Sequence, residues 1–331
     1  KTKAMGLYGL GIPAEYGGPD IDLMTSTLIA IEMSQHRAGL YAPCYGTFGG
    51  AGLAQLFEAT DEQKEQYLFP TLRGEKRCFF GLSEPSGGSD PARAIQTKAE
   101  RDGDDWIING NKMWITNGSV ADVAVVWARD EEGIVRGFLL EKGMDGFTSS
   151  DIHGKLSLRS SVTSELSMEN VRVNDTSRLP NIEGLKGPLS CLTQARYGIA
   201  WGMVGAAVDC YNTALDYSKE RKQFGVQIGS FQALQHRAAK MFCEIELTKS
   251  AVIAAMHAAD ENSNELERLS SLAKFQAGET LHLVSNEAIQ MHGGIGVTDE
   301  YDIGFYLKRA RVAEQIFGTS EFHQARYANI S

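Results

Sequence analysis

Apolar positions in the first 77 residues follow the spacing of helices. The segment LMTSTLIAIEMSQHRAGL (residues 23–40) repeats apolar residues every three or four positions, which is typical of an amphipathic helix. The segment TDEQKEQYLFPTLRGE offers Thr60 or Asp61 as an N-cap and carries acidic residues in its first turn. We therefore expect residues 1–77 to form a helical domain.

The pattern changes to short strand-like runs over residues 78–183. The dipeptides Asp102-Gly103, Asn109-Gly110 and Asn117-Gly118 separate such runs, and they favour the tight turns of hairpins. The runs DVAVVWARD and VRGFLLEKG predict a further hairpin around Glu131-Glu132-Gly133. These residues are expected to form an antiparallel β domain, a small barrel or a sandwich.

Helical spacing returns and lengthens over residues 184–331. One helix is expected in residues 195–225, a second after Ser230, a third from Glu265 to His292 and a fourth in residues 300–317. Small residues in the first of these would allow close helix contacts: Gly198, Ala200, Gly202, Gly205, Ala206 and Ala207. An up-down four-helix bundle follows, and the fold class is α+β.

Composition narrows the classes of partner. The 331 residues are 43% hydrophobic and 22% charged, which is ordinary for a globular protein. A net charge of −10 argues against nucleic acid or an anionic membrane as partner, and no apolar run approaches the ~20 residues of a membrane helix. Five scattered cysteines without a CxxC pair argue against structural zinc and favour a reducing compartment, the cytoplasm or a mitochondrial matrix. The first residues carry no signal peptide and read as the middle of a domain, so we expect an earlier segment to be missing.

Two motifs in the β region are candidates for ligand binding. In FFGLSEPSGGSD (79–90), backbone N–H groups and the hydroxyls of Ser83 and Ser89 could hold a polar ligand, although most such segments are simple turns. In NKMWITNG (111–118), Trp114 could stack on a flat ring while Thr116 bonds to a ring nitrogen; the alternative is a core tryptophan.

Two further motifs lie at helix ends. Arg221 in ERKQFG could pair with a phosphate, or it could simply complement a helix dipole. The glycines of QMHGGIG either stop a helix or let the backbone approach a ligand that Gln290 also contacts. No dinucleotide fingerprint, P-loop or nucleophile elbow is present, and the seven histidines form no ligand spacing.

The order of these motifs is more specific than any one of them. GLSEPSGGSD, INGNKMWITNG, ARYGIAWG, ERKQFG, QMHGGIGVTDEY and FGTSE follow one another along the chain, and together they resemble the acyl-CoA dehydrogenase family. VVWARDEEGIVRGFLLEKGMDGF and ARYGIAWGMVGA are most similar to glutaryl-CoA dehydrogenase within it. The resemblance implies an FAD-dependent oxidoreductase of fatty or amino acid catabolism. It further implies α,β-desaturation of an acyl-CoA thioester, an electron-transfer flavoprotein or similar acceptor, and a homotetramer or dimer.

The resemblance also assigns roles to individual positions. It places the flavin ring against Phe80, Leu82, Ser83, Trp114 and Thr116, with Thr319 near the cofactor. It places Arg221 on the FAD pyrophosphate. The residues implied on the adenine side, often reached from a neighbouring subunit, are Phe224, Gln232, Gln290, Gly293 and Gly294. The acyl-CoA is implied at Gly88 and Ser89, with Arg196 near its CoA moiety.

The position of the family's catalytic base is the main departure. The glutamate that removes the α-proton normally precedes GT in the last motif, and here Phe317 stands there. A minority of the family carries this glutamate just before the arginine of ARYGIA, and here Ala195 occupies that position. Three interpretations stay open: a relocated carboxylate, with Glu314 and Glu321 each one turn away; a reaction that needs no strong base, such as elimination or monooxygenation; or a non-catalytic FAD- and acyl-CoA-binding subunit.

The substrate pocket departs as well. Tyr41 stands where glutaryl-CoA dehydrogenase has the arginine for the distal carboxylate, and Ser34 replaces a nearby glutamate. A buried carboxylate without its cation would be costly, so a glutaryl substrate is disfavoured. Tyr41, Tyr45 and Phe317 indicate either an apolar, aromatic-lined acyl pocket or ordinary packing.

Overall fold

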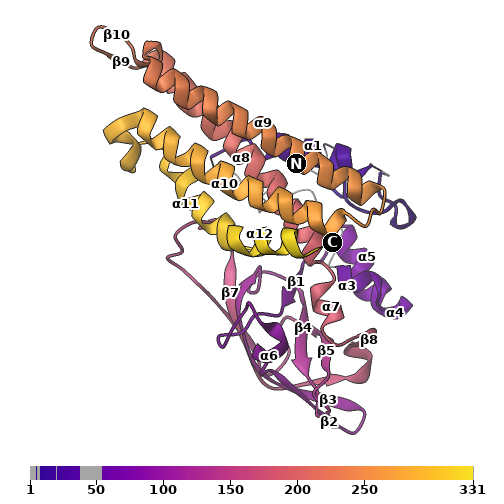
Figure 1. The fold of residues 1–331 in the computed structure, drawn as a ribbon. Coiled ribbons are helices and arrows are strands. Elements are labelled where there is room, and N and C mark those ends of the chain that lie inside the picture. Colours follow the sequence, from indigo (N-terminus) through magenta and orange to yellow (C-terminus); the bar gives the residue numbers. More distant parts are fainter. Residues whose placement is uncertain (1–4, 6–7, 20, 38–53, 331) are drawn as a thin grey trace. The chain divides into compact units, whose positions relative to one another are not determined.

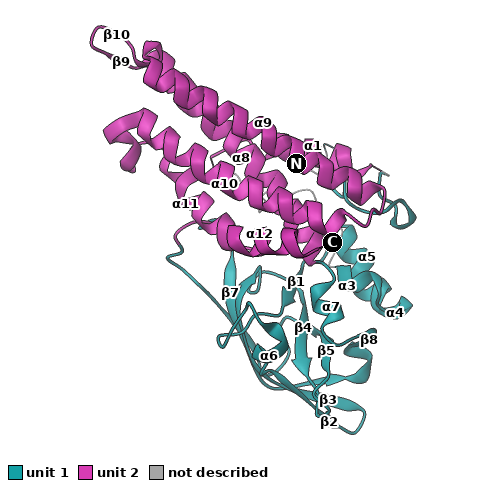
Figure 2. Cartoon of the chain, in the orientation of Figure 1, with its two compact units in different colours: residues 1–19, 48–155, 159–191 teal, residues 20–47, 156–158, 192–331 magenta. Residues whose placement is uncertain are grey.

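The computed structural model describes residues 5, 8–19, 21–37 and 54–330. It divides into two compact units (Figure 2): unit 1 holds residues 1–19, 48–155 and 159–191, and unit 2 holds residues 20–47, 156–158 and 192–331. Each unit has its own hydrophobic core. The domain boundaries expected at residues 77 and 183 stay a prediction.

Unit 1 is built on one eight-stranded sheet (Figure 1), in the order β6-β7-β3-β2-β4-β5-β8 with β1 paired to β4. Hairpins β2–β3, β4–β5 and β6–β7 are antiparallel, as expected, whereas β1 lies parallel to β4. The strands are β1 Cys78–Gly81, β2 Lys98–Asp102, β3 Asp105–Thr116, β4 Val123–Arg129, β5 Val135–Glu141, β6 Phe147–Asp151, β7 Thr163–Asn174 and β8 Arg178–Glu183.

Strand β4 is apolar from Val123 to Ala128 because both of its faces are covered there. Val123, Val125 and Trp127 join a cluster with Leu56 and Leu68 from the short helices of unit 1. Alternate residues of the same strand pack on the other face in a second cluster. A strand buried on both faces reads as a continuous apolar run. The helices of unit 1 are α3 Ala54–Phe57, α4 Asp61–Gln63, a π-helical turn Lys64–Leu68, α5 Phe69–Leu72, α6 Pro91–Ala94 and α7 Lys186–Leu189, with 3-10 turns at Ala14–Tyr16 and Asp175–Ser177.

Two of the expected turns are corrected. Asp102-Gly103 does connect β2 to β3, but Asn109-Gly110 lies inside β3. Gly110 is needed there for another reason: a Cβ on it would come 2.6 Å from the Thr97 hydroxyl, and its φ is 150°. Asn117-Gly118 follows β3 without forming a hairpin, because β3 pairs with β2 and β7 and not with β4. Thr60 is the N-cap at its helix, in a capping box with Gln63.

Unit 2 is a helical assembly around α10 (Figure 1), which contacts α8, α9, α11 and α12. Helix α8 ends at Glu220, before the expected Gly225, and a small β9–β10 hairpin follows it. A further helix, α12, was not expected from the sequence; the Thr319 hydroxyl caps it by accepting from Phe322 N–H. The elements are α1 Leu23–Met33, α8 Leu192–Glu220, β9 Lys222–Gln223, β10 Val226–Gln227, a 3-10 turn Ile228–Ser230, α9 Gln232–Asp260, α10 Leu266–His292, a 3-10 turn Gly293–Val297, α11 Gly304–Gln315 and α12 Ser320–Asn329.

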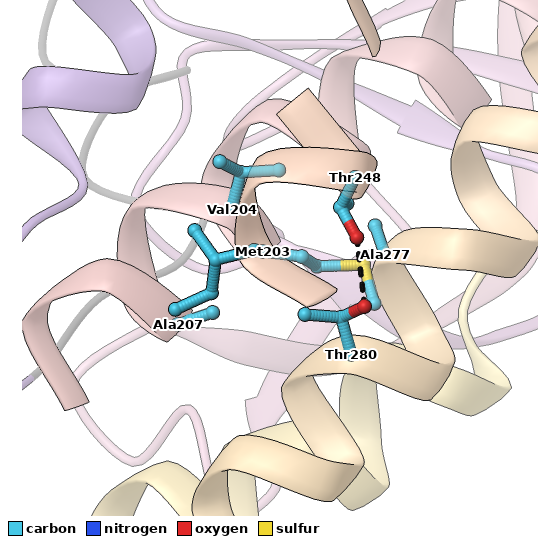
Figure 3. A pocket seen from close by; sticks show the side chains of 7 residues that line it. Met203, Val204, Ala207, Thr248, Ala277 and Thr280 are labelled. Carbon is cyan, nitrogen blue, oxygen red and sulfur yellow. Dashed lines mark hydrogen bonds between the residues drawn. The ribbon is translucent and has the colours of Figure 1, made fainter. Parts of the chain in front are cut away.

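Helices α8, α9 and α10 meet in a close-packed interior (Figure 3). Met203, Val204 and Ala207 of α8 lie beside Ala277 of α10. The hydroxyls of Thr248 on α9 and Thr280 on α10 are 2.7 Å apart and bond to each other, which satisfies both buried groups. None of the helices in the described part of the chain combines the length and apolar composition of a membrane span.

Candidate functional site

Unit 1 presents an exposed tryptophan on a strained bulge. Lys112 of β3 pairs with Leu166 of β7, and Ile115 pairs with Ser164. Between these two pairs β3 has one more residue than β7, so the strand bulges at Met113 and Trp114. Trp114 adopts a left-handed φ of 63° and keeps 57% of its surface exposed. A bulky residue in this region costs about 1–2 kcal/mol and is typical of functional sites. The core-tryptophan alternative is therefore wrong for Trp114.

The strand end after β1 lies next to this bulge. Met113 N–H donates to the Ser83 carbonyl at 2.9 Å, so Ser83 and Trp114 come from neighbouring segments. Thr116 is exposed at the end of β3. Phe80 and Leu82 are half-buried and also pack against the core cluster around Trp127.

These residues fit a flavin by their chemistry. A half-exposed indole offers a flat apolar face, while Ser83 and Thr116 offer hydroxyls for the polar edge of a ring. Gly88 and Ser89 lie exposed in the turn that follows, where a Cβ on Gly88 would come 3.5 Å from the Ser83 hydroxyl. Unit 1 thus brings the sequence-predicted residues 83, 88, 89, 114 and 116 onto two adjoining segments.

Unit 2 gathers the adenine-side candidates at one end of its helices. Tyr217 of α8 stacks on His292 of α10 with ring centroids 4.3 Å apart, which places the carboxyl ends of these helices together. Exposed residues cluster there: Arg221, Phe224, Gln232, Gln290, Gly293 and Gly294. Phe224 is 92% exposed at a φ of 55° in the β9–β10 hairpin. Gly293 has a φ of 67° and ends α10, so this glycine is a helix stop at least.

Phe317 lies in a left-handed turn between α11 and α12. Its φ is 62° and that of Gly318 is 112°. His323 Nε2 lies 3.1 Å from the Phe317 carbonyl oxygen, and Arg196 Nε donates to the same oxygen at 3.5 Å. The Phe317 side chain is half-buried against the core of unit 2. The backbone at this position is thus held by donors from α8 and α12.

The surroundings of this turn are cationic. Lys274 of α10 is 1% exposed, and its ammonium donates to the carbonyls of Gly318 at 3.2 Å and Glu314 at 3.5 Å. Burial lowers the pKa of Lys274 to about 8. Burial and then the charge of Lys274 lower the pKa of His323 to about 4, so this imidazole is neutral near pH 7. A carboxylate placed here would be stabilised in its ionised form.

The two candidate bases lie on different helices, α11 and α12, and not one turn before and after position 317 on a continuous helix. Glu314 Oε2 accepts from Arg311 Nη1 at 2.5 Å, and its side chain is 26% exposed. Glu321 is exposed on the first turn of α12, where its own N–H and the Thr319 hydroxyl lower the pKa of its carboxyl. Ala195 is half-buried beside Arg196. Tyr41 and Tyr45 lie outside the described residues.

We predict that buried His323 makes unit 2 acid-sensitive. Its folded pKa of about 4 lies below the ordinary value of 6.5, so the unfolded chain binds more protons as the pH falls through this window. The contribution is fully present above pH 6.5, and about 2 kcal/mol of it is lost by pH 5. Denaturant unfolding measures the free energy of unfolding of the natural chain and of His323→Gln. The difference between the two values should shrink as the pH falls from 7.5 to 5. A difference independent of pH would contradict a buried, neutral imidazole.

Two groups at this site were missed by sequence reasoning. Lys274 sits within a helix where a solvated lysine is the ordinary expectation, and His323 lies in the helix that was not expected. Thr319 as an N-cap before SEFHQARYAN was the signal that could have revealed α12. No group of three metal-ligating side chains occurs among residues 5, 8–19, 21–37 and 54–330.

Comparison with known proteins covers nearly the whole chain. Three family models match: acyl-CoA dehydrogenase N-terminal domain over residues 1–75, middle domain over 79–171 and C-terminal domain over 183–329. A probable acyl-CoA dehydrogenase of Bacillus subtilis is 36% identical over 98% of this chain and 86% of its own length. A subunit of the caffeyl-CoA reductase–Etf complex of Acetobacterium woodii is 33% identical over 98% of this chain and 86% of its own.

Solved structures agree. A glutaryl-CoA dehydrogenase from Mycobacterium smegmatis is 38% identical with a TM-score of 0.88, covering 99% of this chain and 84% of that one. A second structure, of a glutaryl-CoA dehydrogenase from the same organism in complex with FADH2, is 35% identical with a TM-score of 0.88, covering 98% and 83%. The expected fold is confirmed, and the expected cofactor is confirmed for the family. This chain belongs to the acyl-CoA dehydrogenase family of oxidoreductases.

Proposed function

We propose that this protein is an FAD-dependent oxidoreductase that desaturates an acyl-CoA thioester other than glutaryl-CoA, with its base relocated from position 317. The observation that carries the proposal is Trp114, a strained and half-exposed indole beside the Ser83 strand end in a chain of this family. Strain and exposure at a large aromatic residue are explained if a flat ring covers it.

Each residue has a definite task in this proposal. Trp114 covers one face of the ring, and the Ser83 and Thr116 hydroxyls bond to its polar edge. Bound FAD supplies the hydride acceptor. Gly88 and Ser89 receive the acyl-CoA, Arg196 lies near its CoA moiety, and a carboxylate removes the α-proton.

Glu314 is the better of the two candidate bases. Its carboxylate is a quarter exposed at the end of α11, whereas Glu321 is held at the surface by its own turn. Helix α11 ends at Gln315, so the turn at residues 316–318 separates Glu314 from position 317, and the Glu314 side chain must release Arg311 to reach a substrate.

The acyl group follows from the residues near its expected end. Tyr41 offers no cation for a distal carboxylate, and burying that carboxylate unpaired would be unfavourable. Phe317 replaces a charged group with an apolar one. We therefore propose an uncharged, bulky or aromatic acyl chain.

We propose that the exposed residues Arg221, Phe224, Gln232, Gln290, Gly293 and Gly294 contact FAD held by a neighbouring copy of the chain, in a homotetramer or dimer. An electron-transfer flavoprotein is the proposed acceptor, in line with the Etf complex of the Acetobacterium relative.

Anaerobic titration of the FAD-loaded protein with acyl-CoA thioesters tests this function. We expect branched and aryl acyl thioesters to bleach the long-wavelength flavin band, and glutaryl-CoA to leave it unchanged. Bleaching by glutaryl-CoA alone would contradict the proposed substrate class. Spectral shifts without bleaching across the panel would point instead to a homologue that binds FAD and acyl-CoA without dehydrogenating them.

A further inference from the structure

Unit 1 contains a fully buried ion pair that the proposed chemistry does not use. Lys112 and Glu84 have side chains that are 0% and 3% exposed, and Lys112 Nζ donates to Glu84 Oε1 at 2.7 Å. A buried pair of this kind is often no more stabilising than apolar residues of the same volume. Its stability contribution alone therefore does not explain its presence.

The carboxylate of Glu84 is saturated with donors. Oε1 accepts from Thr97 N–H at 3.0 Å and from the Thr97 hydroxyl at 2.6 Å, and Oε2 accepts from Gln96 N–H at 2.6 Å. Burial opposes its ionisation, but the ammonium of Lys112 and these hydrogen bonds hold the pKa of Glu84 below its usual value. Gln96 and Thr97 thus hold the negative charge of Glu84 in a fixed position.

Lys112 connects the carboxylate of Glu84 to the strand end at Leu82 and Ser83, which is proposed to face the flavin. Its ammonium also donates to the Leu82 carbonyl at 3.3 Å, and the next residue, Met113, donates its N–H to the Ser83 carbonyl at 2.9 Å. Lys112 is the last residue in register with β7 before the bulge that carries Trp114. Three consecutive residues after β1 are thus clamped to the base of the bulge.

We propose that the Glu84–Lys112 pair is a positioning device that sets the bulge of Trp114 against the Leu82–Ser83 strand end, and so presets both surfaces that receive the flavin. The inference rests on the proposed function, because FAD is the ligand whose site is preset. Both side chains are buried, so neither is placed to contact a bound cofactor. Both act through Ser83 and Trp114, which makes them positioning residues.

The experiment compares the full chain with Glu84→Gln, which keeps the shape of Glu84 and removes its charge. We expect the FAD dissociation constant to rise roughly tenfold or more, as when a supporting shell around a site loosens. We expect amide exchange at Met113 to accelerate by a similar factor, because its bond to Ser83 opens more often. The exchange measurement uses the protein without added acyl-CoA and does not depend on activity.

A matched control is available at the far end of β3. Asp175 accepts from Arg101, Trp106 and Arg178, so Asp175→Asn also removes a carboxylate with several donors. Its neighbour Asn174 pairs with Asp105, nine residues before Trp114 along the strand. This variant should leave FAD affinity and Met113 exchange unchanged.

The double variant Glu84→Gln/Lys112→Met separates positioning from stability. It removes the uncompensated charge, so thermal stability should recover, while FAD affinity stays low and Met113 exchange stays fast. If Glu84→Gln binds FAD normally, or if the double variant recovers FAD affinity together with stability, the positioning role is overturned. If Glu84→Gln does not fold, the double variant alone decides between these outcomes. A natural chain that binds no FAD would overturn the proposed function instead, and Met113 exchange would still report on the clamp.

Discussion

Replacing Glu314 by Gln is expected to slow anaerobic flavin bleaching by roughly a hundredfold or more, the usual contribution of a positioned general base. Gln has the same shape as Glu but cannot accept the α-proton at neutral pH. Stopped-flow absorbance with the best thioester of the panel measures the rate. Glu321→Gln is the matched control and should bleach at the natural rate, because its carboxylate is exposed on α12.

Adding Phe317→Glu to the Glu314→Gln chain should restore much of the lost rate. The guanidinium of Arg196 and the buried ammonium of Lys274 both contact the backbone of the Phe317–Gly318 turn, so a carboxylate there stays ionised. Phe317→Gln in the same background supplies the polar shape without the base and should not restore bleaching.

The combination distinguishes the open interpretations of position 317. Natural rates in both Glu314→Gln and Glu321→Gln would end the case for either carboxylate as the base. If none of the thioesters bleaches the flavin of the natural chain but one of them bleaches the flavin of the Phe317→Glu chain, the protein is a family member that binds its ligands and lacks only the base.

The second large effect concerns the crossing of α1 and α8. Gly205→Ala is expected to lower the free energy of unfolding by about 3 kcal/mol, because overpacking a filled interface forces the backbone apart. A Cβ at this position would lie 2.3 Å from the Ile31 carbonyl oxygen and 2.5 Å from Ser34 Cβ. Denaturant unfolding followed by circular dichroism measures the change.

Gly278→Ala supplies the control for this substitution. Gly278 is also buried within a long helix, but its nearest neighbours would be 3.5 Å and 3.8 Å from the new methyl group. The higher helix propensity of Ala should therefore leave stability unchanged or raise it by up to about 1 kcal/mol. Equal losses at both glycines would mean that the α1 contact does not set the cost at Gly205.

Gly205 and Gly110 show what local pattern can and cannot predict. The run of small residues in α8 correctly predicted a close helix contact, because small residues at helical spacing have few other uses. Asn109-Gly110 predicted a turn and was wrong, since Gly110 is required by Thr97 on a neighbouring segment. A glycine in the sequence can indicate that space is limited, but it does not indicate which neighbouring residue limits it.

The candidate site divides in the same way. Ser83, Trp114 and Thr116 were predicted because their motifs are contiguous, and the structure brings their two segments together through Met113. Glu84–Lys112 and Lys274 were not predicted, because each depends on partners 28 or more residues away. Whether Phe317 stands in for the catalytic glutamate stays a prediction that the variants above decide.

The central place of α10 has a consequence for how unit 2 comes apart. Each of α8, α9, α11 and α12 packs against this one helix, so none of them can detach without exposing part of it to solvent. Unit 2 should therefore melt in a single cooperative step, with no stable intermediate that keeps one ligand-binding end ordered while the other unravels.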